Sequence, residues 1–289
     1  MPLDLVAEAV IAGLLLGCFY AAVSLGLSIA FGLLDIPHIA HPAFLVLGAY
    51  GAWWLGTHGI DPLLAGLLLA PLFFGLGLAI YRFYHFAFER DGAEGGLRGL
   101  AFFFGLAFVV EVALILTFGV DQRMAQADYV GQGVDIGGTR WPVRMLIAFG
   151  VAVTLTLALS QFLTRTFAGR AIRAVAQDRT ALALMGADPT RIKQWAFGIA
   201  TATCAIAGAL LLIVGPVEPG LGRLYIGRTF CVVVLAGLGS VQGTLAAGII
   251  LGVTESLVLS SLGTSWAPAV GFGLLLLVLA LRPSGLFGR

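Results

Sequence analysis

Long apolar blocks alternate along the chain with short polar segments. The blocks cover residues 5–31, 42–54, 61–86, 99–119, 142–164, 195–215, 243–262 and 268–281, and a shorter one lies between 226 and 239. The longer blocks reach the length of about 17–25 residues that an α-helix needs to cross a bilayer. The pattern predicts an all-α polytopic membrane protein with eight or nine membrane segments, in one transmembrane domain over residues 1–289.

Two polar interruptions, one in each half of the chain, divide neighbouring apolar stretches. The interrupted stretches cover 31–48 and 215–243, and the segment near Phe230 is short enough to be tilted, re-entrant or broken at Gly237 and Gly239. Corresponding breaks in two halves are typical of transporters with inverted repeats, where free helix ends meet the solute. The breaks therefore favour an inverted repeat with a translocation path, and the alternative is that both are interfacial loops.

Composition supports the membrane assignment and excludes other classes. Apolar residues make up 60% of the 289 residues and charged residues 11%, whereas soluble domains carry about 25% charged residues. The formal net charge of +1 implies no nucleic-acid partner. The three cysteines all lie inside apolar blocks, which is typical of small hydrophobic residues rather than of a disulfide framework or a metal site.

Basic residues predict the orientation of the chain in the membrane. Six arginines and lysines gather in the segment 165–193, and two more arginines lie in the tail 282–289. Such clusters mark cytoplasmic segments, and the count of spans places both on the same side. The same count places the N-terminus and the loop 120–141 outside, and the alternating, Gly-rich stretch 129–138 of that loop predicts a small β-hairpin.

The cytoplasmic segment has the composition of a short, stiff helix. Residues 169–186 are rich in strong helix formers, and Gly186 is a natural residue to follow a helix C-terminus. We expect one helix over 171–185, ended by Gly186, and a second helix capped by Asp188. The segment is either a basic loop that only fixes topology or a docking element that transmits force from a soluble partner.

Four ionisable residues stand out in or beside the predicted spans. Glu111 and Glu255 lie mid-block, where a charged group costs roughly 2.5–3.5 kcal/mol and usually faces the helix bundle or water. Each is interpreted as a structural partner or as a channel-lining group. His38 and His41 are spaced i, i+3 but lack a convincing third ligand, so a broken-helix site is favoured over a metal site.

Several motifs resemble one family along the whole chain. Residues 169–186 match almost throughout the pattern G-R-A-x-R-A-x-A-Q-D-x-x-x-A-x-L-M-G, which is typical of the permeases of branched-chain amino-acid importers, the high-affinity leucine/isoleucine/valine type. The segments 228–240 and 282–288 also resemble motifs of that family, in the same order. In the first motif, where the family commonly has I-N-F-A-H-G-E, residues 37–43 carry His38 and Ala43 at the Asn and Glu positions, which leaves related amides or carboxylates open as solutes.

The resemblance implies a permease subunit of an ATP-binding-cassette importer in the bacterial inner membrane. Its implied partners are a second homologous permease, two cytoplasmic ATPases that bind ATP and Mg, and a periplasmic or lipid-anchored solute-binding protein. No cofactor, metal or catalytic residue is expected on this chain. The residues expected to couple to the ATPases are Arg170, Arg173, Gln177, Asp178, Arg179 and Gly186, and those expected along the path are His38, His41, Pro42, Glu111, Arg228 and Glu255.

Two other function classes were weighed against the importer. An autonomous channel or secondary carrier would not need the elaborate basic segment 165–193. An intramembrane enzyme would need a catalytic constellation, and the sequence has no H-E-x-x-H motif. The sequence also lacks G-x-x-x-x-G-K-[ST], and Lys193 is its only lysine, so ATP hydrolysis is expected on separate subunits.

Overall fold

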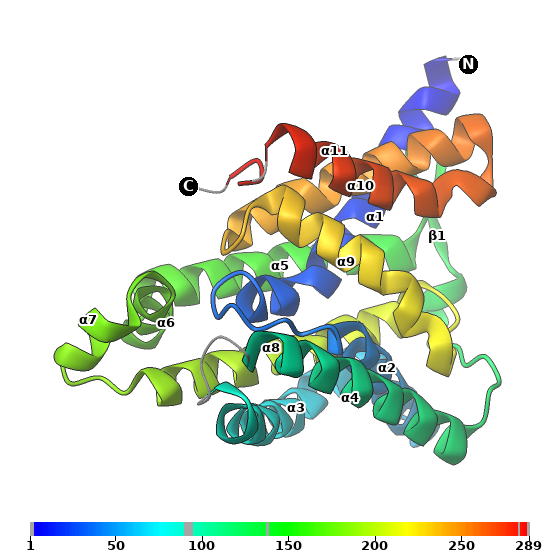
Figure 1. Cartoon of the computed structure of the whole chain (residues 1–289). Coiled ribbons are helices and arrows are strands. Elements are labelled where there is room, and N and C mark those ends of the chain that lie inside the picture. Colours follow the sequence, from blue (N-terminus) through cyan, green and yellow to red (C-terminus); the bar gives the residue numbers. More distant parts are fainter. Residues whose placement is uncertain (1–2, 90–94, 137–138, 283, 288–289) are drawn as a thin grey trace.

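A computed structural model describes residues 3–89, 95–136, 139–282 and 284–287 (Figure 1). Long apolar helices form its body, and eight of the described helices are long and apolar enough to cross a membrane. A further apolar helix, α2, has 17 residues. The predicted all-α polytopic architecture is therefore confirmed. The long helices are α1 (Leu3–Ala30), α2 (His41–Thr57), α3 (Pro62–Ala87), α4 (Gly95–Phe118), α5 (Val143–Arg165), α8 (Pro189–Val214), α9 (Gly222–Ala236), α10 (Val241–Leu262) and α11 (Ala267–Leu281).

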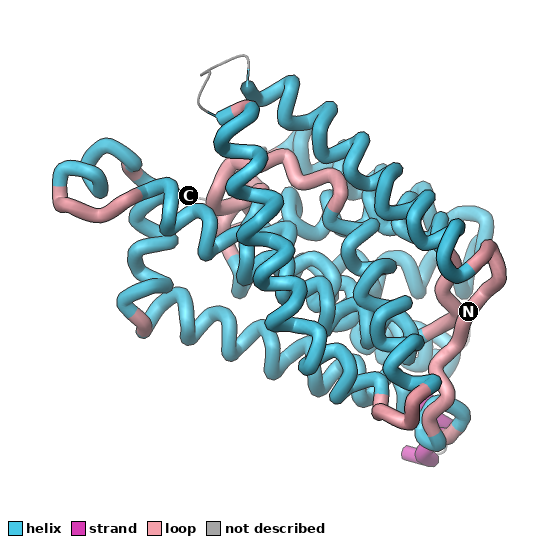
Figure 2. Tube along the Cα trace, turned by 90° about the horizontal axis from the view of Figure 1, so that it is seen from below, coloured by secondary structure: helices cyan, strands magenta, loops and turns pink. Residues whose placement is uncertain are grey.

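The shorter elements lie at the two ends of the helix body. At one end are α6 (Phe167–Gln177) and α7 (Arg179–Leu184), and at the other is an antiparallel hairpin of β1 (Gly133–Ile136) and β2 (Thr139–Pro142). Figures 1 and 2 show this separation, with α6 and α7 projecting on the left and the strands on the right. The helix α1 begins near the hairpin end, and α11 runs towards the end that carries α6 and α7 (Figure 1). The two predicted loops therefore lie at opposite ends of the helix body, and the assignment of one end to the cytoplasm stays a prediction.

The hairpin is present, although its predicted position was partly wrong. The strands pair Gly133 with Pro142 and Val134 with Trp141, four residues beyond the predicted start at Tyr129. A short 3-10 helix, η2 (Asp128–Gly131), occupies the first part of the predicted stretch. A 3-10 turn forms bonds within the segment, so those residues are not available to a strand ladder.

Close contact between glycines joins the first helix to the tenth. Gly13 and Gly17 on α1 face Gly248 and Gly252 on α10, and each pair has the spacing i, i+4. A Cβ atom at Gly17 would lie 2.5 Å from the Cα of Ile249, and one at Gly252 would lie 2.4 Å from the carbonyl oxygen of Gly13. Small residues at this spacing let membrane helices approach until their backbones touch. The backbones of α1 and α10, which lie near opposite ends of the sequence, are therefore in direct contact.

We expect Gly252→Ala to lower the thermal stability of the purified protein. The new methyl group would overlap backbone atoms of α1, and overpacking of this kind costs about 1–3 kcal/mol. The matched control is Gly150→Ala on α5, where a Cβ meets nothing within 4 Å. Melting curves in detergent measure both variants, and equal melting temperatures for the two would contradict the proposed packing.

The segment predicted to be cytoplasmic contains two helices where the sequence predicted one over 171–185. We call residues 166–188 the elbow. Asp178 interrupts it with extended backbone, φ −153° and ψ 108°, and its carboxylate accepts hydrogen bonds from the N–H groups of Thr180 and Ala181 at 2.8 and 2.9 Å. Helix-forming composition failed here because an aspartate competes for backbone N–H groups and caps a new helix. The prediction for Gly186 is confirmed, since its φ is +81°.

The uncertain segment near Phe230 is a short helix between two breaks. The helix α9 begins at Gly222 directly after a 3-10 turn, η3 (Pro219–Leu221), so it starts earlier than the sequence suggested. It ends at Gly237, and both Gly237 and Gly239 have positive φ, 86° and 84°. The predicted break at these glycines is confirmed, because only glycine adopts this backbone without strain.

Candidate functional site

The two predicted breaks, far apart in the sequence, lie side by side in the structure. A Cβ atom at Gly222 would lie 3.2 Å from the carbonyl oxygen of Pro42, and one at Gly32 would lie 2.4 Å from the backbone nitrogen of Gly239. The first break therefore contacts both ends of α9. Pro42 occupies the first turn of α2, and neither α2 nor α9 has a side-chain cap at its N-terminus. Two uncapped helix N-termini thus meet in this region.

The two histidines of the first break belong to the closed core. Both are 0% exposed. The His41 ring places Nε2 2.8 Å from the carbonyl oxygen of Val23 and Nδ1 3.3 Å from the Cys204 sulfur. The His38 ring packs against Phe103 and Phe197, and its nitrogens have no hydrogen-bond partner among the described residues. Neither side chain lines an open passage in this conformation, so their place on a path stays a prediction.

Arg228 and Glu255, predicted separately, form one ion pair inside the membrane region. The Arg228 Nη2 donates to Glu255 Oε1 at 2.6 Å, which joins α9 to α10. Glu255 is 2% exposed, whereas the Arg228 side chain keeps 21% exposure. The guanidinium also lies 5.6 and 5.7 Å from the rings of Tyr20 and Tyr225. Part of this paired arginine therefore remains exposed on α9.

A second ion pair holds the beginning of α9 against α4. Arg223 donates to Glu111, with Nε and Oε2 3.1 Å apart, and its side chain is 65% exposed. Together the two pairs give α9 two cationic side chains within an apolar layer. The span that contains α9 has the lowest mean hydropathy of the eight candidate spans, 1.2. The span that contains α9 is therefore the least apolar of the eight candidate spans.

The sequence reasoning missed Glu89, which joins the elbow to the helix body. Its carboxylate accepts hydrogen bonds from Tyr81 at 2.7 Å, from Arg179 at 3.4 Å and from Lys193, and it lies 3.0 Å from His85 Nδ1. We call Glu89, Lys193 and Arg179 the anchor. Lys193 is 3% exposed. The signal was present, because the only lysine in the chain lies at the start of an apolar block and requires an acidic partner.

The Glu89 carboxylate stays ionised at neutral and mildly acidic pH. Burial by itself raises the pKa of Glu89. The hydrogen bonds from Lys193 and His85 and the positive charge of Lys193 together outweigh burial and lower this pKa to about 2. Because this pKa is lower when folded, the stabilisation is complete above the ordinary value of 4.5 and is lost only as pH falls towards 2.

We therefore expect the stability difference between His85→Gln and His85→Gln/Glu89→Gln, in which no imidazole titrates beside residue 89, to stay constant between about pH 8 and about pH 5.5. Thermal melts of both proteins in matched buffers measure it. A difference that fell by half at the lower pH would show that Glu89 takes up a proton in the folded protein.

The six predicted coupling residues divide into three roles. Asp178 and Gly186 shape the elbow, and Arg179 belongs to the anchor. Arg173 and Gln177 line a cavity of about 640 Å³ between α5, α6 and the turn 237–242. Arg170, on the other side of α6, lines a separate apolar cavity.

The elbow is also fixed to α5 and carries an apolar tip. A Cβ atom at Gly169 would lie 2.1 Å from the carbonyl oxygen of Phe162, so α6 folds back in direct backbone contact with α5. Ile172 and Val175 are buried beneath α6. At the tip, Leu184 and Met185 are 84% and 83% exposed. The elbow is therefore held against α5 and exposes two large apolar side chains at its tip.

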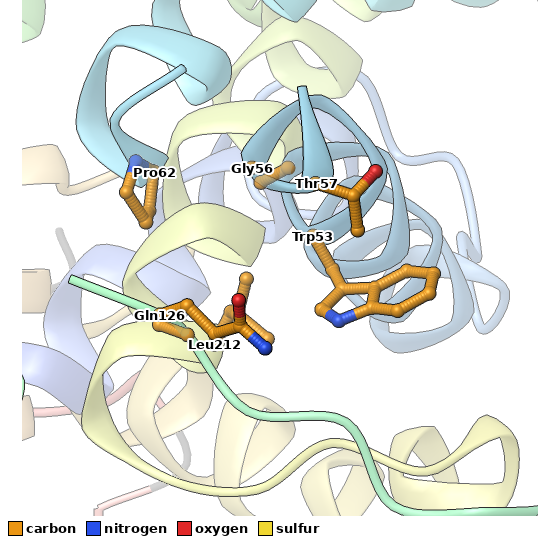
Figure 3. A pocket seen from close by; sticks show the side chains of 8 residues that line it. Trp53, Gly56, Thr57, Pro62, Gln126 and Leu212 are labelled. Carbon is orange, nitrogen blue, oxygen red and sulfur yellow. The ribbon is translucent and has the colours of Figure 1, made fainter. Parts of the chain in front are cut away.

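The opposite end of the molecule is closed by the loop that follows α4. Arg123 and Val217 exchange two backbone hydrogen bonds of 2.8 Å, which fastens this loop over the break before α9. The small pocket in Figure 3 lies beside it, where Trp53, Thr57, Gln126 and Leu212 come together. Its volume of about 10 Å³ has room for roughly one water molecule, so it is too small for a solute.

The chain is similar to known proteins over most of its length. Residues 9–279 match the family model described as branched-chain amino acid transport system / permease component. The chain is 28% identical to the high-affinity branched-chain amino acid transport system permease protein BraD of Pseudomonas aeruginosa, over 96% of this chain and 94% of BraD. It is 30% identical to the corresponding protein LivH of Salmonella typhimurium, with the same coverage. The probable permease LivH of Methanocaldococcus jannaschii is 23% identical over 92% of this chain and 87% of its own length.

Proposed function

The chain belongs to the family of permease components of branched-chain amino acid transport systems, and from this premise we propose that it carries a small carboxylate solute along α9. As a permease of this family it is a membrane subunit of an ATP-binding-cassette importer. Branched-chain amino acids are the first candidate solutes, and related small amides or carboxylates are the next. The observation that carries the proposal is the pair of cationic side chains on α9 beside two uncapped helix N-termini.

The chemistry of this region suits an anionic group. Helix N-termini carry a partial positive charge, and broken helices in transporters direct such ends at solute carboxylates. Arg223 and Arg228 are each paired with a glutamate, so they would bind the solute carboxylate through the guanidinium N–H groups that the glutamates leave free. A hydrogen bond between ionised groups is stronger than one between neutral groups.

The path is proposed to run between α9 and a second permease subunit. The core around His38 and His41 is closed, whereas α9 leaves Arg223, Leu224 and part of Arg228 exposed. Charged side chains in a membrane face a protein interior or a water-filled cavity rather than lipid. A homologous subunit packed against this face would enclose the path and exclude lipid from the two arginines.

The proposed partners at the other surfaces are those of an importer. Two cytoplasmic ATPases, which hold ATP and Mg, would dock on the elbow, and a periplasmic or lipid-anchored binding protein would deliver solute to the opposite end. The bacterial inner membrane is the proposed location. The exposed Leu184 and Met185 suit insertion into an apolar groove of an ATPase. The anchor and the Gly169 contact would transmit the movement to α5 and α8.

The proposed coupling role predicts that Gly186→Val abolishes most transport without blocking assembly. Valine strongly disfavours the φ of +81° at this position, so the elbow would be misdirected while the spans stay intact. With partner subunits in liposomes, solute uptake and solute-stimulated ATP hydrolysis should each fall about tenfold or more, which corresponds to roughly 1.4 kcal/mol of coupling.

Gly59→Val is the matched control for this experiment. Gly59 has a φ of +83° in the turn between α2 and α3, at the opposite end of the molecule, and a Cβ there meets nothing within 4 Å. It should carry a similar backbone strain and leave uptake within twofold of wild type. Equal activity of the two variants would favour a basic segment that only fixes topology.

Reconstitution of the permease alone separates the importer from an autonomous carrier. The chain without its ATPases should give no uptake above empty liposomes. Uptake by the chain alone would favour a channel or secondary carrier and overturn the ATP-driven mechanism.

A further inference from the structure

An apolar cavity lies beneath the elbow, separate from α9 and its charged pairs. Its volume is about 810 Å³, within the range of about 300–1,000 Å³ typical of small-molecule sites. The walls come from α3, α5, α6, α7 and α8, with aromatic and aliphatic side chains such as Phe74, Phe162 and Trp195. The two charged residues in the lining are both arginines, Arg170 and Arg191. The cavity therefore combines an apolar interior with positive charge.

The charge and the apolar surface are arranged along the membrane normal. On α8, Arg191 lies in the first turn and Ile199 lies eight residues deeper, a distance of about 12 Å along the helix. Trp195 lies between them and is 59% exposed, and tryptophan is enriched at membrane interfaces. The cavity thus begins at the cytoplasmic end of the spans and continues into the apolar layer.

Neither arginine is neutralised within a closed network. Among the described residues no carboxylate pairs with Arg170. Arg191 lies 3.4 Å from Asp188, but this pair is on the surface, with 82% of the Arg191 side chain exposed. An exposed pair of this kind is weak and leaves the arginine available to another anion.

We propose that this cavity binds an anionic phospholipid of the cytoplasmic leaflet. One acyl chain would lie along Ile192, Trp195 and Ile199, and the phosphate would contact Arg170 and Arg191. Anionic lipids on the cytoplasmic surface attract basic residues at this depth. The lipid would fill the space between α6 and α8 and so support the angle of the elbow. This site does not depend on which solute the permease carries.

The test is native mass spectrometry of the full-length permease with equal amounts of phosphatidylglycerol and phosphatidylcholine. Phosphatidylglycerol should be retained about tenfold more than phosphatidylcholine. The double variant Arg170→Gln/Arg191→Gln should reduce its retention at least tenfold, since each basic residue contributes a factor of about five. The cavity-filling variant Ala174→Phe should reduce the retention of both lipids, because Ala174 lines the apolar wall.

Three controls keep the result interpretable. Arg165→Gln removes a charge at the end of α5, outside the cavity, and should leave retention within twofold. Ala181→Phe enlarges an exposed residue of α7 outside the lining and should have no effect. Arg170→Lys with Arg191→Lys keeps both charges and should retain the preference for the anionic lipid.

Localisation decides between this lipid and the other occupants. A photoactivatable phosphatidylglycerol should crosslink to residues 168–174 and 191–199 of the full chain and of the assembled complex. Equal retention of both lipids, or crosslinks elsewhere, would overturn the site. Loss of the crosslink when the ATPases bind would also overturn it, because the cavity would then receive part of an ATPase.

Discussion

Replacing Glu255 by methionine is expected to destabilise the permease and to remove solute uptake. The substitution leaves Arg228 in the membrane region without its partner at 2.6 Å. Breaking a buried ion pair on one side costs about 3–5 kcal/mol, which is more than a hundredfold in the folding equilibrium. Melting temperature, expression and uptake by the assembled complex measure the loss.

The double variant Arg228→Met/Glu255→Met separates a structural role from a role in transport. Because an apolar pair of similar volume commonly replaces a buried ion pair without loss, we expect the melting temperature to recover. Uptake should stay at least about tenfold below wild type, since the exposed part of Arg228 is proposed to contact the solute. Full recovery of uptake would show that the pair only holds α9 to α10.

Glu111→Gln is the control for Glu255→Met. It also removes an ion pair of α9, but Arg223 is largely exposed and can be hydrated. Exposed pairs contribute little to stability, so its melting temperature should stay close to that of wild type. An equal loss of stability for Glu111→Gln and Glu255→Met would contradict the difference in burial.

Replacing Glu89 by methionine is expected to uncouple ATP hydrolysis from uptake. The change removes the acceptor for Lys193, which is 3% exposed, and for Arg179 on the elbow. An uncompensated buried lysine costs about 3–5 kcal/mol, which the protein can relieve by releasing the elbow from α8. The number of solute molecules transported per ATP should fall at least about fivefold.

The double variant Glu89→Met/Lys193→Met tests whether the contact or the charge matters. It removes both members of the buried pair, so the melting temperature should recover. Coupling should recover only in part, because Arg179 still lacks its contact with residue 89. Wild-type coupling in Glu89→Met itself would show that the anchor does not transmit force.

Much of the architecture was determined by the sequence alone. Apolar blocks predicted the long helices because a backbone in lipid must satisfy its hydrogen bonds within the same segment. Local chemistry also predicted that Gly186 follows a helix C-terminus, where its φ is +81°. The same local rules failed at Asp178, where composition favoured a continuous helix and the side chain capped a new one.

Only the tertiary structure decided which of these elements meet. The sequence marked Arg228 and Glu255 as candidate path residues and did not single out Glu89, and the partners in the two buried ion pairs lie 27 and 104 residues apart. Those pairings depend on how closely the helices approach, and contacts such as Gly17 with the α10 backbone set that distance. Hydropathy and helix propensity describe one segment at a time. The candidate path and the anchor arise from contacts between segments, and for that reason they became visible only in the folded chain.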